Sequence, residues 1–227
     1  MHEPFPPQEP ARHEKPFSPP KPALSPELPA AEFIDVGGHT AFVMLPGAAR
    51  ATGRSPVRSH AGSDAHSSAP VRWVWYAPTL FPHLPDAHMA WIFESFLSRD
   101  IAVAGIDAGE SYGSPQGTAV YSALYERLTK ERGFSARPAL LPRSRGGLML
   151  YNWASRNADS VSCIAGIYPV CDLASYPGLA KACGAYGMSE EALAGSLHEH
   201  NPVDRTAPLA AARVPIWHIH GDQDRLV

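Results

Sequence analysis

A serine followed by two glycines stands where an apolar stretch gives way to a helical pattern. The segment reads ALLPRSRGGLM, with Ser144 ahead of Gly146 and Gly147. A nucleophilic serine needs such a setting, because a sharp strand-to-helix turn lifts its hydroxyl above the sheet and small residues let the two backbones approach. The first N–H groups of the helix, including that of Arg145, could bind a developing oxyanion. An ordinary helix N-cap serine is the alternative interpretation.

The turn departs from the usual pattern at one position. The G-x-S-x-G arrangement maps onto residues 142–146, so Pro142 replaces the first glycine. Proline accepts an extended backbone but is larger than glycine, which leaves the geometry of the turn open. Arg143 and Arg145 flank the serine and would suit an anionic substrate, with Arg143 a candidate pocket residue. The alternative is that both arginines point to solvent.

A carboxylate follows the last apolar stretch, VPIWHIHG. Asp224, with Asp222 in reserve, is a candidate for the acid that orients a histidine and stabilises its charged form. The alternative is an Asx-type turn, which is common after strands.

The same segment contains HIHGDQD, which is similar to the H-x-H-x-D-H zinc motif of metallo-β-lactamase-type hydrolases. Histidine and carboxylate ligands suit Zn²⁺, so a zinc hydrolase that uses His218 and His220 is a rival interpretation. However, Gln223 stands where that pattern requires histidine, and no other ligand cluster supports it.

Polar residues also follow two other apolar stretches. In YAPTL, Thr79 is a candidate for the second backbone donor of an oxyanion hole, and a turn set by Pro78 is the alternative. In GIDAGESYGSP, Glu110 and Tyr112 are candidates for a substrate pocket. Together with Asp107, they could equally organise the turn through hydrogen bonds.

Alternating strands and helices must position these residues. Amphipathic helices are predicted after Asp86, which is a candidate N-cap, around Val120 and Leu128, after Ser144 and near residues 189–199. Strands are predicted at 71–78, 101–107, 136–142, 161–170 and 214–221, after a hairpin within 32–46. This order predicts an α/β fold with a mostly parallel sheet covered by helices on both faces. Ligands of such sheets lie beyond the carboxyl ends of the strands, where all the candidates lie.

In chain order, these segments resemble the α/β-hydrolase family, in its serine esterase and prolyl-oligopeptidase-like branches. The landmarks are YAPTL, a D-x-G-x-x-x-G-S turn, the serine turn, and P-x-D-x-x-x-P-L-A-x-A-x-V-P-I-x-x-x-H-G-x-x-D at residues 202–224. The resemblance covers about residues 32–227. It implies a Ser-Asp-His triad with Ser144 as nucleophile and Asp224 as acid, and backbone N–H groups of Arg145 and Thr79 as oxyanion donors.

The resemblance implies cleavage of a carboxylic ester through an acyl-enzyme on Ser144, with a peptide bond as the second candidate. The Ser144-Arg145 dipeptide is similar to the S-R of glucuronoyl esterases, so a carbohydrate-linked ester is one candidate substrate. No cofactor or metal is implied. A non-catalytic binding protein of the same fold is the alternative function.

The family pattern continues with a helix, a strand and a loop that bears the catalytic histidine. No histidine follows Asp224 in this sequence, so we expect a fragment truncated before that residue, with the C-terminal strand and helix missing. A serine hydroxyl without a base is a weak nucleophile, and an uncovered sheet edge is a liability, so we expect the fragment to be nearly inactive and poorly soluble. His83 and His88 follow the first long strand, a position that the family does not use for the base.

Composition narrows the class of partner. The 227 residues include 19 basic and 22 acidic side chains, a formal net charge of -3, which gives no sign of nucleic-acid binding. No apolar run approaches the roughly 20 residues of a membrane helix, and the N-terminus lacks an apolar signal region, so a cytoplasmic location is the default. We expect a small-molecule ester substrate, and the oligomeric state is not predicted.

The chain is predicted to form one incomplete hydrolase domain, 31–227, after a disordered Pro-rich segment, 1–30. Within the domain, 47–70 is predicted to be a flexible loop, and 172–200 either a small lid or a surface excursion. The three cysteines match no zinc pattern and are expected as thiols, with a Cys171–Cys183 bridge as the alternative.

Overall fold

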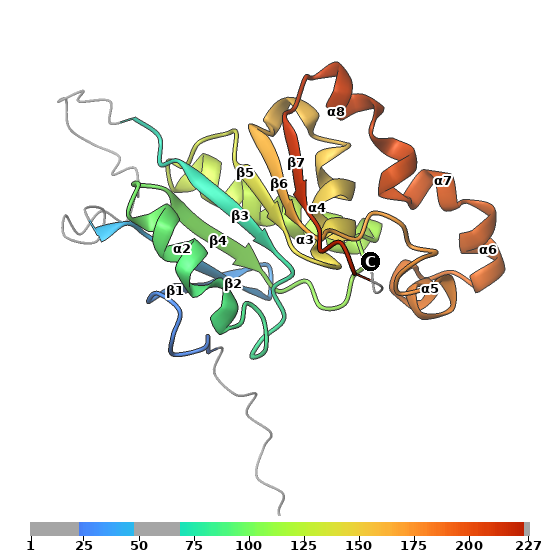
Figure 1. The fold of residues 1–227 in the computed structure, drawn as a ribbon, viewed down its shortest axis with the longest axis horizontal. Coiled ribbons are helices and arrows are strands. Elements are labelled where there is room, and N and C mark those ends of the chain that lie inside the picture. The colour runs from blue at the N-terminus through green and yellow to red at the C-terminus, as the bar shows by residue number, and fades with distance from the viewer. Residues whose placement is uncertain (1–22, 48–68, 225–227) are drawn as a thin grey trace, which may run out of the picture.

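The computed structural model describes residues 23–47 and 69–224 (Figure 1). Most of the predicted disordered segment and of the predicted 47–70 loop therefore lies outside the described residues. The described part is built around one seven-stranded sheet, ordered β1-β2-β4-β3-β5-β6-β7. The predicted α/β class and the predominantly parallel sheet are confirmed.

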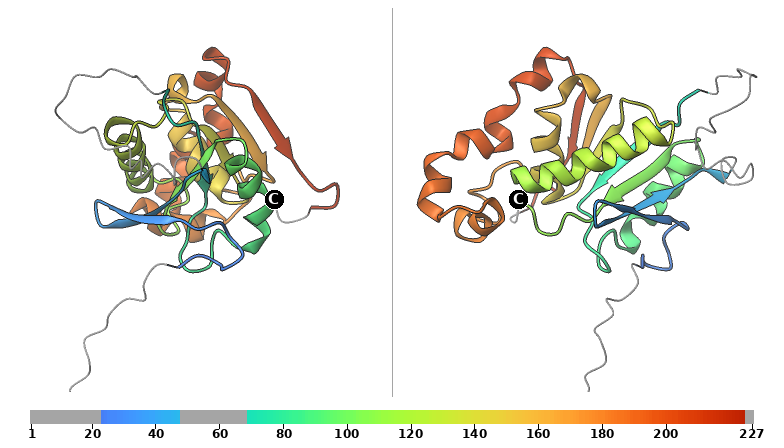
Figure 2. Two further views of the ribbon diagram at one scale, coloured as in Figure 1. Left: turned by 90° about the vertical axis from the view of Figure 1, so that its left-hand side faces the viewer. Right: turned by 180° about the vertical axis from the view of Figure 1, so that it is seen from behind.

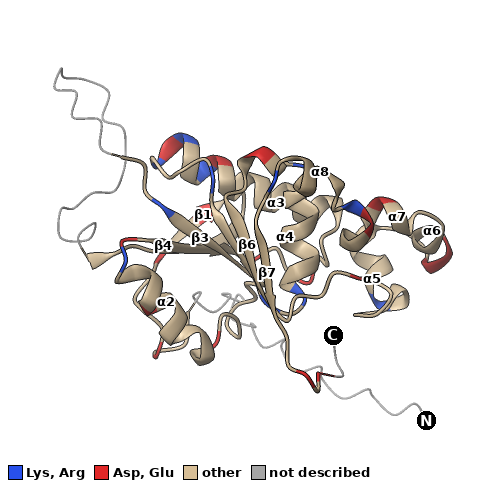
Figure 3. Ribbon diagram, turned by 45° about the horizontal axis from the view of Figure 1, so that its top comes forward, with Lys and Arg blue, Asp and Glu red and all other residues tan. Residues whose placement is uncertain are grey.

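The strands follow the sequence pattern closely. The hairpin β1 (Glu32–Val36) and β2 (His39–Met44) is antiparallel, and β2 pairs antiparallel with β4. The parallel strands are β3 (Trp73–Ala77), β4 (Ala102–Ile106), β5 (Ala139–Pro142), β6 (Cys163–Ile167) and β7 (Ile216–Ile219). These five strands carry no Lys, Arg, Asp or Glu, and Figure 3 shows the charges on helices and loops instead. Such uniformly apolar strands are typical of a parallel sheet buried on both faces.

Helices cover both faces of the sheet. One face is covered by η1 (Ala87–Met89) and α2 (Ala90–Leu97), and the other by α3 (Pro115–Glu126), α4 (Gly146–Ala154) and α8 (Ala207–Ala211), as Figures 1 and 2 show. The remaining helical turns are η2 (Arg127–Glu131), η3 (Ala158–Ser160) and η4 (Pro202–Arg205). Asp86 is the N-cap of η1, as predicted, and accepts a hydrogen bond from the His88 N–H.

An aromatic cluster fixes α3 and α4 to the middle of the sheet. Trp75 of β3 is fully buried, and its ring centre lies 4.8 Å from that of Trp153 in α4 and 5.6 Å from that of Tyr121 in α3. Each such aromatic pair stabilises the fold by about 0.5–1.5 kcal/mol beyond its buried area. The helix that begins just after Ser144 is therefore anchored along its length.

Residues 172–200 form three short helices rather than the single predicted one. They are α5 (Leu179–Tyr186), α6 (Glu190–Gly195) and α7 (Leu197–His200). Leu173, Ala182, Tyr186 and Leu193 pack in a third core cluster with Tyr112, Leu148 and Val170. The segment thus rests on the start of α4 and on the loop after β4, and its role as a lid stays a prediction.

Two features of the boundaries differ from a simple hydrolase domain of residues 31–227. Leu28 is only 7% exposed and belongs to the core cluster of α2, so the described end of the Pro-rich segment contacts the domain through this residue. At the opposite edge of the sheet, Trp217 and Ile219 of β7 are 62% and 71% exposed. Within 23–47 and 69–224, no strand pairs with the outer side of β7.

Two further predictions concern chemistry and membranes. Cys163, Cys171 and Cys183 are all free thiols, so the alternative Cys171–Cys183 bridge is wrong. None of the helices in the described ranges is long and apolar enough to cross a membrane.

Candidate functional site

Ser144 occupies a left-handed turn between β5 and α4. Its φ is +50°, a conformation that costs a non-glycine residue about 1–3 kcal/mol unless its surroundings impose it. Here they do: the Ser144 N–H donates to the Ile167 carbonyl at 3.0 Å, and the Ser144 carbonyl accepts from the Val170 N–H at 2.9 Å. The strand–turn–helix setting that a nucleophilic serine requires is thus present.

The two glycines after the serine are needed for space. A Cβ on Gly146 would lie 2.1 Å from the Ala77 carbonyl oxygen, and one on Gly147 would lie 2.2 Å from the Val170 carbonyl oxygen. Pro142, by contrast, is accommodated as the buried last residue of β5, opposite Ala77. The next N–H, from Arg143, donates to the Ala77 carbonyl at 2.8 Å, so proline does not prevent the turn.

The backbone around the serine leaves one N–H available for an oxyanion. The N–H groups of Gly146 and Gly147 are bonded to the carbonyls of Arg143 and Ser144, both at 2.9 Å. The Arg145 N–H, between them, has no acceptor among the described residues. The end of α4 with uncompensated N–H groups also favours negative charge. Arg145 is therefore well placed for the role predicted for it.

Thr79, the second predicted donor, lies in the loop after β3. It forms a parallel bridge with Asp107 and is 1% exposed, and its hydroxyl has no partner in the part of the chain that the structure describes. The neighbouring Leu80 N–H is bonded to the Leu84 carbonyl at 3.0 Å and is not free. The Thr79 assignment stays a prediction.

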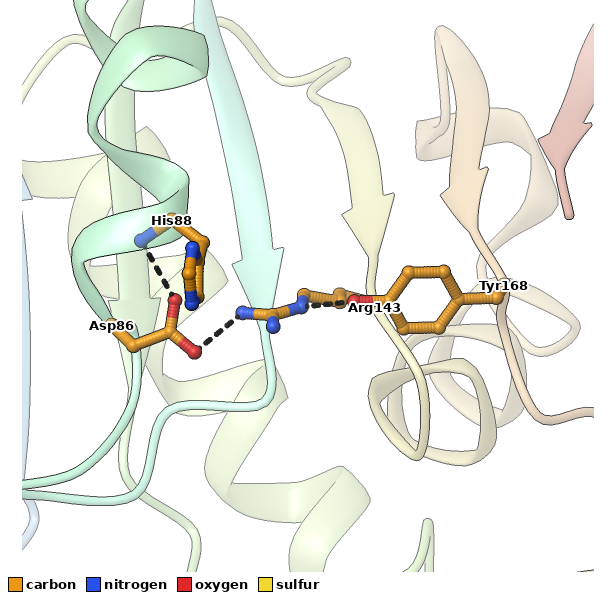
Figure 4. A network of polar contacts seen from close by, with 4 residues as sticks. All are labelled: Asp86, His88, Arg143 and Tyr168. Carbon is orange, nitrogen blue, oxygen red and sulfur yellow. Dashed lines mark hydrogen bonds and ion pairs between the residues drawn. The ribbon is translucent and has the colours of Figure 1, made fainter. Parts of the chain in front are cut away.

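The two arginines beside Ser144 are held by carboxylates. Arg143 donates to Asp86 at 2.9 Å and to the Tyr168 hydroxyl at 2.7 Å (Figure 4), and Arg145 pairs with Glu110 at 2.9 Å. Burial lowers the pKa of Arg143, but the hydrogen bonds to Tyr168 and Asp86 raise it by more than burial lowers it. The pKa therefore lies above its ordinary value, and the guanidinium stays charged. The alternative that both arginines point to solvent is wrong.

The loop after β4 is organised by Asp107. Its carboxylate accepts hydrogen bonds from the N–H groups of Phe81 at 2.9 Å and Gly109 at 2.8 Å. Tyr112 is 5% exposed, and its carbonyl accepts a hydrogen bond from the Tyr186 hydroxyl at 2.9 Å. Burial, followed by the nearby Glu110 carboxylate, raises the pKa of Tyr112. Asp107 and the Tyr112 carbonyl are therefore engaged in hydrogen bonds within the protein. The pocket role of Glu110 and Tyr112 stays a prediction.

Asp224 lies in the turn after β7, and its N–H donates to the Gly221 carbonyl at 3.2 Å. Because β5, β6 and β7 are parallel neighbours, Ser144 and Asp224 follow the same edge of the sheet, two strands apart. Two strand spacings amount to about 10 Å, which leaves room for an imidazole between them. No described side chain is hydrogen-bonded to the Ser144 hydroxyl.

His218 of β7 and His220, which follows that strand, belong to a different cluster. His218 Nε2 lies 2.6 Å from the Tyr151 hydroxyl, and the rings of His218 and His220 are 5.6 Å apart on one side of the strand. Burial, then the proximity of His220, lowers the pKa of His218. No group of three or more metal-ligating side chains occurs within residues 23–47 and 69–224. Since Tyr151 also engages His218, nothing in the geometry supports the zinc interpretation.

Sequence reasoning missed the network that surrounds Arg143. Asp86 was recognised only as a helix cap, and Tyr168 was not recognised at all, although its φ of +36° marks a second constrained position. The partners lie 57 and 25 residues from Arg143 along the chain, so only the fold brings them together.

Comparison with known proteins shows which fold the site belongs to. No protein-family description and no curated protein matches the sequence. Solved structures do match, and the S-formylglutathione hydrolase of Agrobacterium tumefaciens has a TM-score of 0.61 at 15% identity, over 87% of this chain and 76% of that one. The chain has the α/β-hydrolase fold.

Larger α/β-hydrolase proteins match as well. A puromycin-hydrolyzing peptidase of Mycobacterium tuberculosis gives a TM-score of 0.56 at 17% identity, over 88% of this chain and 32% of that one. Dipeptidyl peptidase 4 of Porphyromonas gingivalis gives 0.55 at 13% identity, over 86% of this chain and 32% of that one. The chain thus spans about a third of the length of these two peptidases.

The closeness of β3 to the start of α4 can be tested by substituting a glycine. We expect Gly146→Ala to lower the free energy of unfolding by about 1–3 kcal/mol, because its methyl group would collide with backbone rather than with a movable side chain. Gly184→Ala in α5, where a Cβ meets nothing within 4 Å, is the control and should be neutral or stabilising. Equal effects in denaturant titrations would contradict the packing.

Proposed function

We propose that the protein is a serine hydrolase that cleaves a carboxylic ester through an acyl-enzyme on Ser144. The observation that carries the proposal is the left-handed backbone of Ser144, next to a backbone N–H of Arg145 that has no acceptor among the described residues. A strained residue of this kind persists only where its surroundings enforce it, and such residues gather at functional sites. The alternative of an N-cap serine has no support, because the N-cap of α4 is Arg145 and it makes no side-chain cap hydrogen bond.

The reaction would proceed in two acyl transfers. The Ser144 Oγ attacks the ester carbonyl carbon while its proton passes to a histidine, and the oxyanion is bound by the N–H groups of Arg145 and Thr79. The intermediate collapses, and the alcohol leaves with the proton from the histidine. Water then attacks the acyl carbon, gives its proton to the same histidine, and releases the carboxylic acid as Ser144 regains its hydrogen.

Asp224 would hold the imidazole in the required tautomer and stabilise its charged form. We place the histidine itself outside the described residues. Of the described histidines, His39 bonds to the Asp107 carbonyl, and His218 bonds to Tyr151. None is hydrogen-bonded to the Ser144 hydroxyl.

The Ser144-Arg145 dipeptide, which is similar to the S-R of glucuronoyl esterases, is what favours an ester over a peptide bond. The pairing of Arg143 with Asp86 and of Arg145 with Glu110 removes the main argument for an anionic substrate, because both guanidinium groups already have a carboxylate partner. The preferred substrate is therefore a small ester without a required negative charge, and a carbohydrate-linked ester meets this description.

Covalent labelling tests the nucleophile. In a protein that contains the catalytic histidine, we expect a fluorophosphonate to label Ser144, detected as one added mass on the peptide that contains it. Ser144→Ala should abolish labelling, and Ser162→Ala, just before β6, should not change it. A protein that is folded by circular dichroism yet unlabelled would contradict catalysis and favour the alternative of a binding protein with this fold.

The acid is tested by comparing two neighbouring aspartates. Asp224→Asn should slow the phosphonylation of Ser144 by at least about 100-fold, because an amide cannot hold the histidine in the productive tautomer. Asp222→Asn is the matched control and should stay within about twofold of the unsubstituted protein. If Asp222→Asn proves the slower variant, the acid has been assigned to the wrong residue.

A further inference from the structure

Arg143 uses two of its three guanidinium nitrogens in bonds to protein groups. Its Nε donates to the Tyr168 hydroxyl at 2.7 Å and its Nη1 to Asp86 at 2.9 Å, and the group lies 5.9 Å from the centre of the Tyr168 ring. The side chain is 17% exposed. A planar fork with two directed bonds holds one orientation, which a lysine ammonium group could not reproduce.

The two partners of Arg143 come from the strands on either side of its own. Asp86 closes the loop that follows β3, Tyr168 follows β6 directly, and β3, β5 and β6 are neighbours in the sheet. Figure 4 shows the arginine reaching across the strand ends between the two. Arg143 thereby fastens both flanking loops to the residue before Ser144.

The loop after β3 is also anchored at its beginning. Asp107 accepts the Phe81 N–H at 2.9 Å, and reciprocal backbone hydrogen bonds between Leu80 and Leu84 close the middle of the loop. Thr79 lies at this first anchor, and Asp86 is the second. With both anchors in place, the loop has a fixed position relative to the serine turn.

We propose that Arg143 is a positioning residue: its bonds to Asp86 and Tyr168 hold the loop that carries Thr79 where an oxyanion on Ser144 can be bound. This inference rests on the proposed function. It replaces the substrate contact expected of Arg143 from the sequence, because the guanidinium already serves two protein partners.

A positioning role predicts which kinetic quantity changes. Displacing an oxyanion donor by a fraction of an ångström weakens the transition state much more than the initial complex. Loss of Arg143 should therefore lower the limiting rate of phosphonylation at saturating fluorophosphonate and leave the half-saturating concentration unchanged. A substrate contact would show the reverse pattern.

The test measures both quantities in the full-length protein for three variants. Arg143→Met removes the charge and both bonds, Asp86→Asn removes one charge but keeps an N-cap side chain for η1, and Tyr168→Phe removes one acceptor. We expect the limiting rate to fall about 10- to 100-fold in Arg143→Met and in Asp86→Asn, and less in Tyr168→Phe. The double variant Arg143→Met/Asp86→Asn should be no slower than Arg143→Met, because the pair acts as one unit.

Glu32→Gln provides the matched control. Glu32 pairs with the buried Arg132 at 2.6 Å, so the substitution also leaves a buried arginine without its carboxylate, but the pair lies on β1 and at the end of η2, away from Ser144. It should lower stability without changing the phosphonylation rate. If Arg143→Met does not fold, Asp86→Asn and Tyr168→Phe carry the test.

Three results separate the possible failures. Limiting rates within twofold of the unsubstituted protein in folded Asp86→Asn and Arg143→Met overturn the inference and leave the proposed function intact. A raised half-saturating concentration with an unchanged limiting rate also overturns it and makes Arg143 a substrate contact. Absence of labelling in the unsubstituted protein overturns the proposed function itself, and the inference with it.

Discussion

The candidate site depends on the left-handed backbone of one residue, Ser144. The strain at this position is balanced by hydrogen bonds on both sides of the residue and by a helix that cannot move away. All nine residues of α4 are buried, and its first two glycines touch the backbone of β3 and of the segment after β6. The core therefore enforces a turn that the serine alone would not adopt. The packing of α4 offsets the backbone strain of about 1–3 kcal/mol at Ser144.

The charged side chains at the carboxyl edge of the sheet bind one another or backbone N–H groups. Arg143 is paired with Asp86, Arg145 with Glu110, and Asp107 accepts two backbone N–H groups. Each ion pair joins loops that follow different strands of the sheet. Because these side chains are partly buried, their electrostatic attraction is stronger than it would be in water. In this arrangement, both guanidinium groups are paired with protein carboxylates, whereas the Arg145 N–H has no acceptor among the described residues.

The sequence was sufficient for features that depend on local pattern. The apolar runs predicted the strands, Asp86 was recognised as a helix cap, and the serine followed by two glycines located the turn. It was insufficient where the deciding contact joins distant segments: the ion pair of Arg143 with Asp86 spans 57 residues, and the burial of Leu28 depends on a core formed with α2. Helix α5 was not predicted; it packs against Tyr112 and Leu148, which lie far from it along the chain.

An experimental structure of the phosphonylated protein tests the central claim most directly, because the phosphonyl oxygen takes the place of the oxyanion. The account predicts a covalent bond from the Ser144 Oγ to phosphorus, Ser144 with a φ near the +50° seen here, and a phosphonyl oxygen about 2.7–3.1 Å from the Arg145 N–H. A Ser144 relaxed to a negative φ, or an adduct whose oxygen points away from the start of α4, would contradict it.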